Sequence, residues 1–253
     1  MKVSFDATGE VVVITGGARG IGAALAEAIA RRNGTAVVFD VVAPQTGTPL
    51  AQTGTPSAGV VYVEVDVSDR EAVLKAVGSV VERYGRIDGL VAGAAVQPRA
   101  AVVDMDPADW THTLKVNLDG VVWVCQAVVP QMVDRRSGSV IVFTSGMAST
   151  GYPGAAAYAA SKAAVTAFAR TLAAEVAEHR VRVNIVAPGV IDTDQFRSAN
   201  TSAGREHWRD TLGIGDPEDV VGPLLFLLSD AAAMTGSQLT RERAFGRLDS
   251  FKE

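Results

Sequence analysis

The stretch VVVITGGARGIG, from Val11 to Gly22, decides the fold of this chain. Its opening VVVIT is apolar or β-branched without alternation, which is typical of a strand buried on both faces of a parallel sheet. The glycines that follow permit a tight turn, and 23–32 has a helix-forming composition. A strand, a glycine-rich turn and a helix N-terminus together form an anion site suited to a pyrophosphate. The stretch therefore predicts a dinucleotide-binding unit.

A second strand, predicted over 35–40, ends in Asp40, twenty residues after Gly20. A carboxylate there would accept hydrogen bonds from the adenosine ribose hydroxyls and repel a 2′-phosphate, which favours NAD over NADP. Arg19 lies inside the glycine turn and could contact a phosphate, so NADP stays open as the less favoured cofactor. Asp40 could also be an ordinary turn residue. The residues of the turn that we expect to contact the cofactor are Gly16, Arg19, Gly20, Ile21 and Gly22.

Strands and helices alternate along the rest of the chain. Further strands are predicted at 60–65, 87–92, 139–145 and 181–186, with a short last strand at 237–240. Ser68 and Glu71 have the spacing of a capping box and predict the start of the helix after the third strand. This order predicts a doubly wound α/β fold, a mainly parallel sheet of six to seven strands with helices on both faces. We expect a single domain over 1–253, since α/β folds often reach this size as one unit.

Composition argues against several classes of protein. The net charge is −5 and no Lys/Arg cluster is longer than a pair, so no nucleic-acid partner is expected. The longest apolar runs, 121–130 and 220–228, are shorter than the roughly 18–20 residues that span a bilayer, so they are predicted to be core helices and no membrane partner is expected. No export signal is visible and the only cysteine is Cys125, which favours a reducing, cytoplasmic location. The histidines form no HExxH pair, so no metal is predicted.

The segment YAASK places Tyr158 and Lys162 four positions apart in an Ala-rich run that is predicted to be helical. At this spacing both side chains share one helix face. A phenol titrates near ~10, and an ammonium one turn away favours the phenolate. Tyr158 is therefore a candidate general acid/base. Taken alone, the pair is more typical of an ordinary Tyr and a solvated Lys.

Several motifs in one order make the chain, from about Val11 to Gln238, resemble the short-chain dehydrogenase/reductase (SDR) family. The motifs are TGGARGIG at 15–22, VNLDG at 116–120, Ser145 thirteen residues before Tyr158, YAASK at 158–162 and NIVAPGVIDT at 184–193. The resemblance implies a Rossmann fold and hydride transfer between a nicotinamide and a carbon that bears an alcohol or ketone oxygen. The substrate that it implies is a small molecule.

The resemblance also implies four catalytic roles. Tyr158 would exchange a proton with the substrate oxygen, and Ser145 would hydrogen-bond that oxygen where charge develops. Lys162 would keep the phenolate accessible and hold the nicotinamide ribose. Asn117 would hold a water that links Lys162 to solvent, although an Asn in mid-helix can instead satisfy backbone groups.

The loops at the strand ends supply the remaining candidate site residues. Cofactor contacts are expected from Asp66, Val67, Ala92, Gly93, Pro188, Gly189, Ile191 and Thr193, together with Tyr158 and Lys162. Asp66 is equally well explained as a turn residue. The substrate pocket is expected to include Ser145, Met147, Tyr152 and Gln97. A loop at about 190–215 is expected to cover the substrate as a lid.

Two segments depart from the family pattern. Ala92 to Ala95 reads AGAA where the family usually has NNAG, so the asparagines that brace the central sheet are missing and we expect a loss of local order with cofactor binding retained. The tail 241–253 opens with a charged triplet, RER, where the family continues with a VDGG-like strand and turn. Because family members often use that edge in tetramers, the expected homodimer or homotetramer is in doubt.

The leading hypothesis is an NAD-dependent oxidoreductase that acts on a secondary alcohol or ketone. An NADP-dependent carbonyl or acyl-thioester reductase is one alternative, and Asp40 speaks against it. A catalytically silent dinucleotide-binding sensor or scaffold is the other, and the intact Ser145, Tyr158 and Lys162 speak against that.

Overall fold

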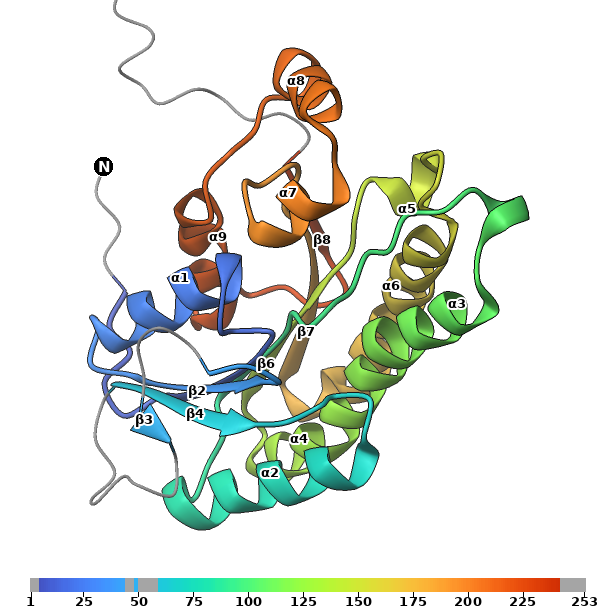
Figure 1. Ribbon diagram of the computed structural model, residues 1–253. Helices are drawn as coiled ribbons and strands as arrows, with labels where there is room; N and C mark the ends of the chain where they lie inside the picture. The colour runs from blue at the N-terminus through green and yellow to red at the C-terminus, as the bar shows by residue number, and fades with distance from the viewer. Residues whose placement is uncertain (1–4, 44–47, 50–58, 242–253) are drawn as a thin grey trace, which may run out of the picture.

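The computed structural model describes residues 5–43, 48–49 and 59–241, and these residues form one parallel sheet flanked by helices (Figure 1). The sheet order is β3-β4-β2-β1-β5-β6-β7-β8. The strands are β1 (Val11–Thr15), β2 (Thr35–Asp40), β3 (Thr48–Pro49), β4 (Gly59–Glu64), β5 (Gly89–Ala92), β6 (Gly138–Phe143), β7 (Val181–Ala187) and β8 (Gln238–Thr240). The order reverses between β1 and β5, and ligands bind outside the carboxyl ends of strands at such a point.

The helices cover both faces of the sheet, so the predicted doubly wound architecture is confirmed (Figure 1). They are α1 (Gly20–Ala30), α2 (Arg70–Tyr84), α3 (Pro107–Leu114), α4 (Gly120–Arg135), α5 (Met147–Thr150), α6 (Ala156–Val176), α7 (Asp194–Ala199), α8 (Ser202–Thr211) and α9 (Glu218–Leu228). α1 and α9 pack on one face, and α2, α4 and α6 pack on the other. The predicted seven strands are present, and the two-residue β3 adds an eighth at the edge.

The first strand shows why its sequence does not alternate. Val11 and Val13 face the core under α2, α4 and α6, whereas Val12 and Ile14 face the core under α1 and α9. Successive side chains of a strand point to opposite faces, so a strand with two buried faces is apolar at every position. β1 is consequently fixed at the centre of the sheet, and the turn that follows it is fixed at the carboxyl edge.

The start of α2 differs from the prediction. Asp69, not Ser68, is the N-cap, because its Oδ1 accepts hydrogen bonds from the backbone N–H groups of Glu71 (3.0 Å) and Ala72 (3.1 Å). The Ser68 hydroxyl instead donates to Asp66 Oδ1 at 2.7 Å. The capping box predicted for Ser68 and Glu71 is therefore wrong, because Asp69 caps the helix one position later and the Ser68 hydroxyl is bonded to Asp66.

The helical segment 107–135 is continuous, and a π turn at Lys115–Asp119 joins α3 to α4. By length and composition alone this segment is apolar enough to cross a membrane, but half of its apolar window is buried inside the protein. Its α4 part packs against α2 and the sheet. The prediction that 121–130 forms a core helix is thus confirmed.

Candidate active site

The turn between β1 and α1 has no room for side chains at its glycines. A Cβ on Gly16 would lie 2.7 Å from Ala94 Cα, and a Cβ on Gly22 would lie 2.7 Å from the carbonyl oxygen of Gly16. Gly20 has a φ of +57°, and a Cβ there would lie 3.0 Å from Thr193 Cγ2. The turn therefore presents bare backbone to the edge of the sheet, where a phosphate group can approach closely.

The N-terminus of α1 is open to an anion. Its N-cap residue, Arg19, makes no side-chain cap hydrogen bond, and no acidic residue occupies the first turn. The first N–H groups of a helix then remain available, and the helix dipole favours negative charge beside them. The Arg19 guanidinium lies 3.9 Å from the Asp194 carboxylate of α7, and both are exposed. These features fit the pyrophosphate of a dinucleotide.

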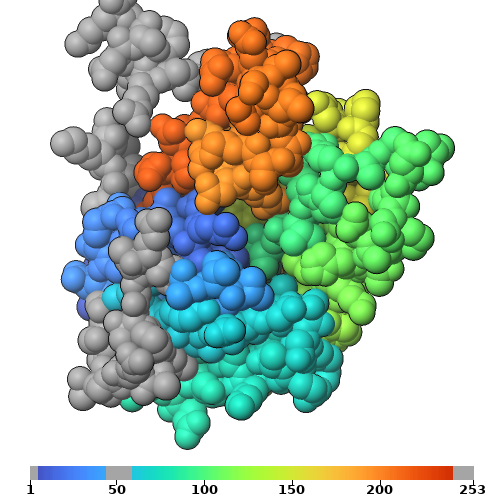
Figure 2. All heavy atoms as spheres, viewed as in Figure 1, coloured from blue at the N-terminus to red at the C-terminus, as the bar shows by residue number. Residues whose placement is uncertain are grey.

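A cavity of about 280 Å³ lies between this turn and α7. It is lined by residues of the turn, of α1 and of α7, among them Gly17, Ala18, Arg19, Asp194 and Arg197. Figure 2 shows the same arrangement from outside, with the orange segments of α7 and α8 standing over the blue segment that holds the turn. The predicted lid at 190–215 thus contains two helices.

Asp40 lies beside the glycine turn at the end of β2. Its Oδ2 accepts a hydrogen bond from the backbone N–H of Ala18 at 3.0 Å, and its Oδ1 accepts one from Val42 at 3.3 Å. Across the described part of the chain, no Lys or Arg forms an ion pair with Asp40. The carboxylate has further lone pairs that can accept hydrogen bonds at the position predicted for ribose recognition.

The AGAA loop after β5 is held by side chains from elsewhere. The Thr15 hydroxyl accepts from the N–H groups of Gly93 (3.1 Å) and Ala94 (3.2 Å). Asn117 Oδ1 accepts from Val96 N–H at 2.8 Å, while Asn117 Nδ2 donates to the Val96 carbonyl at 2.9 Å. Thr15 and Asn117 therefore supply hydrogen bonds to the segment that lacks the expected asparagines.

Asn117 also joins this loop to the first turn of α6. It is fully buried in the π turn, and its Nδ2 lies 3.1 Å from the Ser161 hydroxyl. Ser161 in turn donates to the Tyr158 carbonyl at 2.7 Å. The side chain thus satisfies backbone and hydroxyl groups, as the simpler interpretation of Asn117 expects. Its part in a water path to Lys162 stays a prediction.

Ser145, Tyr158 and Lys162 come together at the carboxyl end of β6. The Ser145 hydroxyl hydrogen-bonds to Tyr158, and Lys162 Nζ lies 5.7 Å from the centroid of the Tyr158 ring. Burial raises the pKa of Tyr158 above its ordinary value, while the Ser145 hydrogen bond and the charge of Arg99 act in the opposite direction. Lys162 is only 2% exposed, and burial lowers its pKa to about 8.

The residues predicted for the substrate pocket also converge. Gln97 Nε2 lies 3.7 Å from Met147 Sδ, and the Met147 N–H donates to the Ser145 hydroxyl at 3.2 Å. The Tyr152 ring packs against Trp208 of α8, with 5.2 Å between the ring centroids. Helix α8 therefore meets the loop before α6.

Arg99 lies among these predicted pocket residues, although no sequence pattern had marked it. Its guanidinium lies over the Tyr152 ring, 4.9 Å from the centroid, and its charge acts on the pKa of Tyr158. Arg99 is the only charged residue between Asp88 and Asp104. A lone charge in a loop that follows a central strand was the feature that could have revealed it.

The segment after β7 reaches the glycine turn through Thr193. Its hydroxyl caps α7 by accepting from Phe196 N–H at 3.2 Å, and its methyl group faces Gly20. Ile191 is buried in the core, where it bridges to Gly215, so only its backbone can face a cofactor. Pro188 is half-buried and Gly189 adopts a φ of +79° at the strand end.

Two predicted cofactor contacts, Asp66 and Val67, are weaker as side-chain sites. The Asp66 carboxylate accepts from both the N–H (2.9 Å) and the hydroxyl (2.7 Å) of Ser68, which makes Asp66 a turn residue. Val67 is buried, and its side chain faces Gly120. Within the described residues, no group of three or more His, Cys, Asp or Glu side chains could hold a metal ion.

Comparison with known proteins gives the family. A family model described as short chain dehydrogenase matches residues 10–204. The chain belongs to the short-chain dehydrogenase family. The resemblance inferred from the motifs is thereby confirmed, and the protein is an oxidoreductase with the Rossmann-type fold of that family, whose members bind a nicotinamide dinucleotide.

The similar proteins are named for different substrates and cofactors. The chain is 38% identical over 234 residues to the 3-oxoacyl-(acyl-carrier-protein) reductase FabG of Thermotoga maritima, which covers 91% of this chain and 95% of the relative. It is similar to a gluconate 5-dehydrogenase of Burkholderia cenocepacia solved with NADP and tartrate (TM-score 0.83, 29% identity, 93% and 94% covered). It is also similar to an NAD+-bound xylitol dehydrogenase (TM-score 0.80, 25% identity, 92% and 97% covered).

Proposed function

We propose that the protein interconverts a secondary alcohol and its ketone with NAD(H), using Tyr158 as the general acid/base. The observation that carries this proposal is the convergence of Ser145, Tyr158 and Lys162 at the carboxyl end of β6. Family membership supports the oxidoreductase class. The dinucleotide supplies the hydride acceptor or donor when it is bound.

In the reducing direction, Tyr158 donates its hydroxyl proton to the substrate oxygen. Its raised pKa keeps the phenol protonated at neutral pH, which suits a proton donor. The Ser145 hydroxyl hydrogen-bonds the same oxygen as negative charge develops on it. The Lys162 ammonium stabilises the phenolate that remains, because an opposite charge nearby favours the charged form. In the oxidising direction, the phenolate of Tyr158 removes the alcohol proton.

Four groups of residues would hold the cofactor. The backbone of the glycine turn and the N-terminus of α1 would bind the pyrophosphate. Asp40 would accept hydrogen bonds from the adenosine ribose, and Lys162 would hold the nicotinamide ribose. The backbone of 188–193 would lie along the nicotinamide. Asp40 favours NAD, because its unpaired carboxylate would repel a 2′-phosphate.

An NADPH-dependent reductase of 3-oxoacyl thioesters is the second candidate. It is supported by the similarity to the Thermotoga maritima reductase. The environment of Asp40 opposes it. A silent sensor or scaffold is less well supported, because the three reacting side chains are present and adjacent. The homo-oligomer and the cytoplasmic location expected from the sequence stay predictions.

The test measures NADH and NADPH oxidation with neutral ketones and with a 3-oxoacyl thioester. Tyr158→Phe should lower kcat/KM by about 100- to 10,000-fold, the range that proton transfer contributes. Tyr84→Phe is the matched control, since it also removes one phenol hydroxyl, one that is buried outside the site without a hydrogen-bond partner. If Tyr158→Phe turns over like the parent, the proposed mechanism is wrong.

Asp40→Ala tests the cofactor assignment. Removing the carboxylate should shift the ratio of kcat/KM toward NADPH, because the repulsion of a 2′-phosphate is lost. An unchanged ratio contradicts the assigned role of Asp40. A parent that uses only NADPH and the thioester favours the second candidate.

A further inference from the structure

The guanidinium of Arg99 lies beside Tyr152 and Met147, two residues predicted for the substrate pocket. It sits over the Tyr152 ring at 4.9 Å, and its Nη1 lies 4.0 Å from Met147 Sδ. Its charge also acts on Tyr158. Because Met147 N–H donates to Ser145 at 3.2 Å, one methionine residue links the guanidinium to the hydroxyl that would hold the substrate oxygen.

Two donor atoms of Arg99 have no partner among the described residues. Nε and Nη2 are buried and make no hydrogen bond, and Nη1 has only the thioether of Met147, a weak acceptor. In the part of the chain that the structure describes, no Asp or Glu forms an ion pair with Arg99. A guanidinium stays charged in proteins, so burial without an acceptor destabilises the protein unless a ligand supplies one.

The two unpartnered atoms define the shape of that ligand. Nε–H and the adjacent Nη2–H lie on one edge of the planar guanidinium and point in the same direction, which matches the two oxygens of a carboxylate. We infer that Arg99 binds a carboxylate of the substrate, so that the ketone or alcohol of the proposed function, on which this inference rests, is a small oxo or hydroxy acid.

The reaction on such a substrate balances without a further reactant. In reduction the carbonyl π bond breaks, the carbon gains a hydride from the reduced nicotinamide, and the oxygen gains the proton of Tyr158. The carboxylate is unchanged and serves only to orient the molecule, as bidentate arginine clamps do. Met147 contacts Arg99 through its sulfur and Ser145 through its backbone N–H, so the guanidinium and the Ser145 hydroxyl share one neighbouring residue.

A structural role for Arg99 is the competing explanation. Arg99, Tyr152 and Trp208 stack in series, so the cation could simply hold the lid helix α8. Loss of such a role would weaken every substrate to the same extent. Loss of a carboxylate partner would weaken only acids.

The experiment therefore compares acids with their neutral esters. Pyruvate, acetoacetate and levulinate, each against its methyl ester, are reduced by the parent, Arg99→Met, Arg99→Lys and the control Arg31→Met, which removes a cation from the exposed end of α1. The parent should prefer at least one acid over its ester. Arg99→Met should lower kcat/KM for that acid by roughly 100-fold and leave the ester unchanged. Arg99→Lys should recover part of the loss, since lysine restores the positive charge but not the two parallel N–H donors of the guanidinium.

A binding measurement separates this inference from the proposed function. Acetoacetate should raise the melting temperature of the parent more than its methyl ester does, and Arg99→Met should abolish the difference. Selective binding of the acid without turnover supports Arg99 and contradicts the proposed function. Turnover of ketones with equal losses for acid and ester in Arg99→Met, or no selective stabilisation by the acid, overturns the role of Arg99.

Discussion

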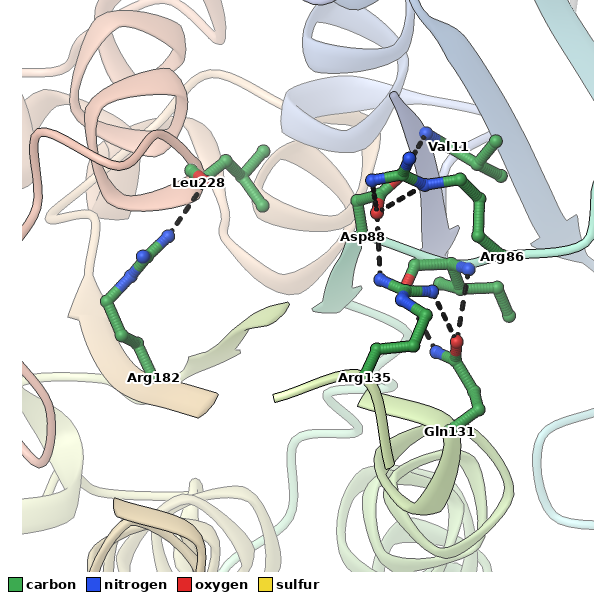
Figure 3. Close-up of polar contacts among 8 residues, drawn as sticks. Val11, Arg86, Asp88, Gln131, Arg135, Arg182 and Leu228 are labelled. Atoms are coloured by element: carbon green, nitrogen blue, oxygen red, sulfur yellow. Dashed lines mark hydrogen bonds and ion pairs between the residues drawn. The ribbon is translucent and has the colours of Figure 1, made fainter. Parts of the chain in front are cut away.

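Charged side chains have hydrogen-bond partners at one end of the parallel sheet, whereas two cations at the other end lack carboxylate partners among the described residues. At the amino ends of the strands, Asp88 accepts hydrogen bonds from Val11 N–H (2.9 Å), Arg86 Nε (2.8 Å) and Arg135 Nη2 (2.9 Å). Gln131 Oε1 accepts from a second nitrogen of Arg135. Figure 3 shows these side chains and backbone groups pointing toward one another across β1, β5 and α4. The charges here are partnered within the protein.

The carboxyl ends of the strands carry cations without such partners. Among the described residues, Lys162 Nζ has no hydrogen bond, and its neighbour is the Tyr158 ring. Arg99 has two buried nitrogens without acceptors. Charged groups that hold the fold together are satisfied inside the protein, whereas a buried cation kept without a partner, as a ligand-binding group would be, reduces stability. Removing a charge should therefore have opposite effects at the two ends.

The carboxyl ends of the strands, where Lys162 and Arg99 lie, are called the open end below. Lys162→Met should have the largest effect there. Catalysis should fall by roughly 100-fold or more, because the phenolate of Tyr158 loses its neighbouring charge. The free energy of unfolding near pH 7 should rise by about 3 kcal/mol, since burial lowers the pKa of Lys162 from 10.5 to about 8. Urea denaturation measures this change, with Lys75→Met on the exposed face of α2 as the control.

The stability gain of Lys162→Met should depend on pH. Below about 8 the unfolded chain binds the proton more tightly than the folded protein, so the folded parent carries the full penalty. The penalty disappears as the pH rises from about 8 through 10.5, because the unfolded lysine then loses its proton as well. A gain that stays constant across this interval contradicts the assigned cause.

The amino ends of the strands, where Asp88, Arg86 and Arg135 lie, are called the closed end below. Asp88→Ala should lower the free energy of unfolding at this end. The side chain of Asp88 is 9% exposed, and its loss leaves Val11 N–H, Arg86 and Arg135 without their acceptor. Because both arginines keep some contact with water, we expect a decrease of about 2–3 kcal/mol in the free energy of unfolding. Urea denaturation should show this without a change in KM. A stabilised variant would remove the contrast between the two ends.

Asn117→Ala tests whether Asn117, which lies at the open end, stabilises the fold through its hydrogen bonds. It makes three buried hydrogen bonds to Val96 and Ser161, so its loss should lower the free energy of unfolding by about 2 kcal/mol. Ser161→Ala, which removes one of these bonds, should lower it by about 1 kcal/mol. If Asn117→Ala reduces turnover with full stability, its predicted water path explains the residue better than bracing does.

The sequence predicts the framework and the reacting residues for a physical reason. A buried strand needs apolar side chains at every position, so β1 is visible in VVVIT, and a glycine turn is visible because only glycine fits at Gly16 and Gly22. Ser145, Tyr158 and Lys162 are predicted as a set because their spacing resembles that of the short-chain dehydrogenase/reductase family. These features depend on local sequence.

Other features have no clear local pattern. The N-cap of α2 is Asp69 and not its neighbour Ser68, and both residue types can cap a helix. The π turn at 115–119 leaves no trace in apolar periodicity. Arg99 enters the pocket because its loop pairs with the loop before α6, through the bridge between Ala100 and Ala155. No local pattern encodes that contact. The prediction for the tail 241–253 falls outside the described residues except at Arg241, whose guanidinium binds Asp219.

Glu10→Gln should change the free energy of unfolding least, and it tests whether every carboxylate at the closed end stabilises the fold. Glu10 lies beside Asp88, and burial followed by the Asp88 charge raises its pKa above 4.5. The folded protein therefore favours protonated Glu10, so no penalty exists below 4.5, and one develops as the pH rises through the folded pKa. At neutral pH the variant should be more stable by less than ~1 kcal/mol, since water screens this half-exposed group.

The control for Glu10→Gln is Glu175→Gln, on the exposed face of α6. Stability of both variants is measured by urea denaturation at pH values below 4.5 and near neutrality. Only Glu10→Gln should gain stability as the pH rises. If it loses stability instead, Glu10 is a further partner of Arg86 and the closed end holds no excess negative charge. If it gains, burial and the charge of Asp88 outweigh the attraction between Glu10 and Arg86.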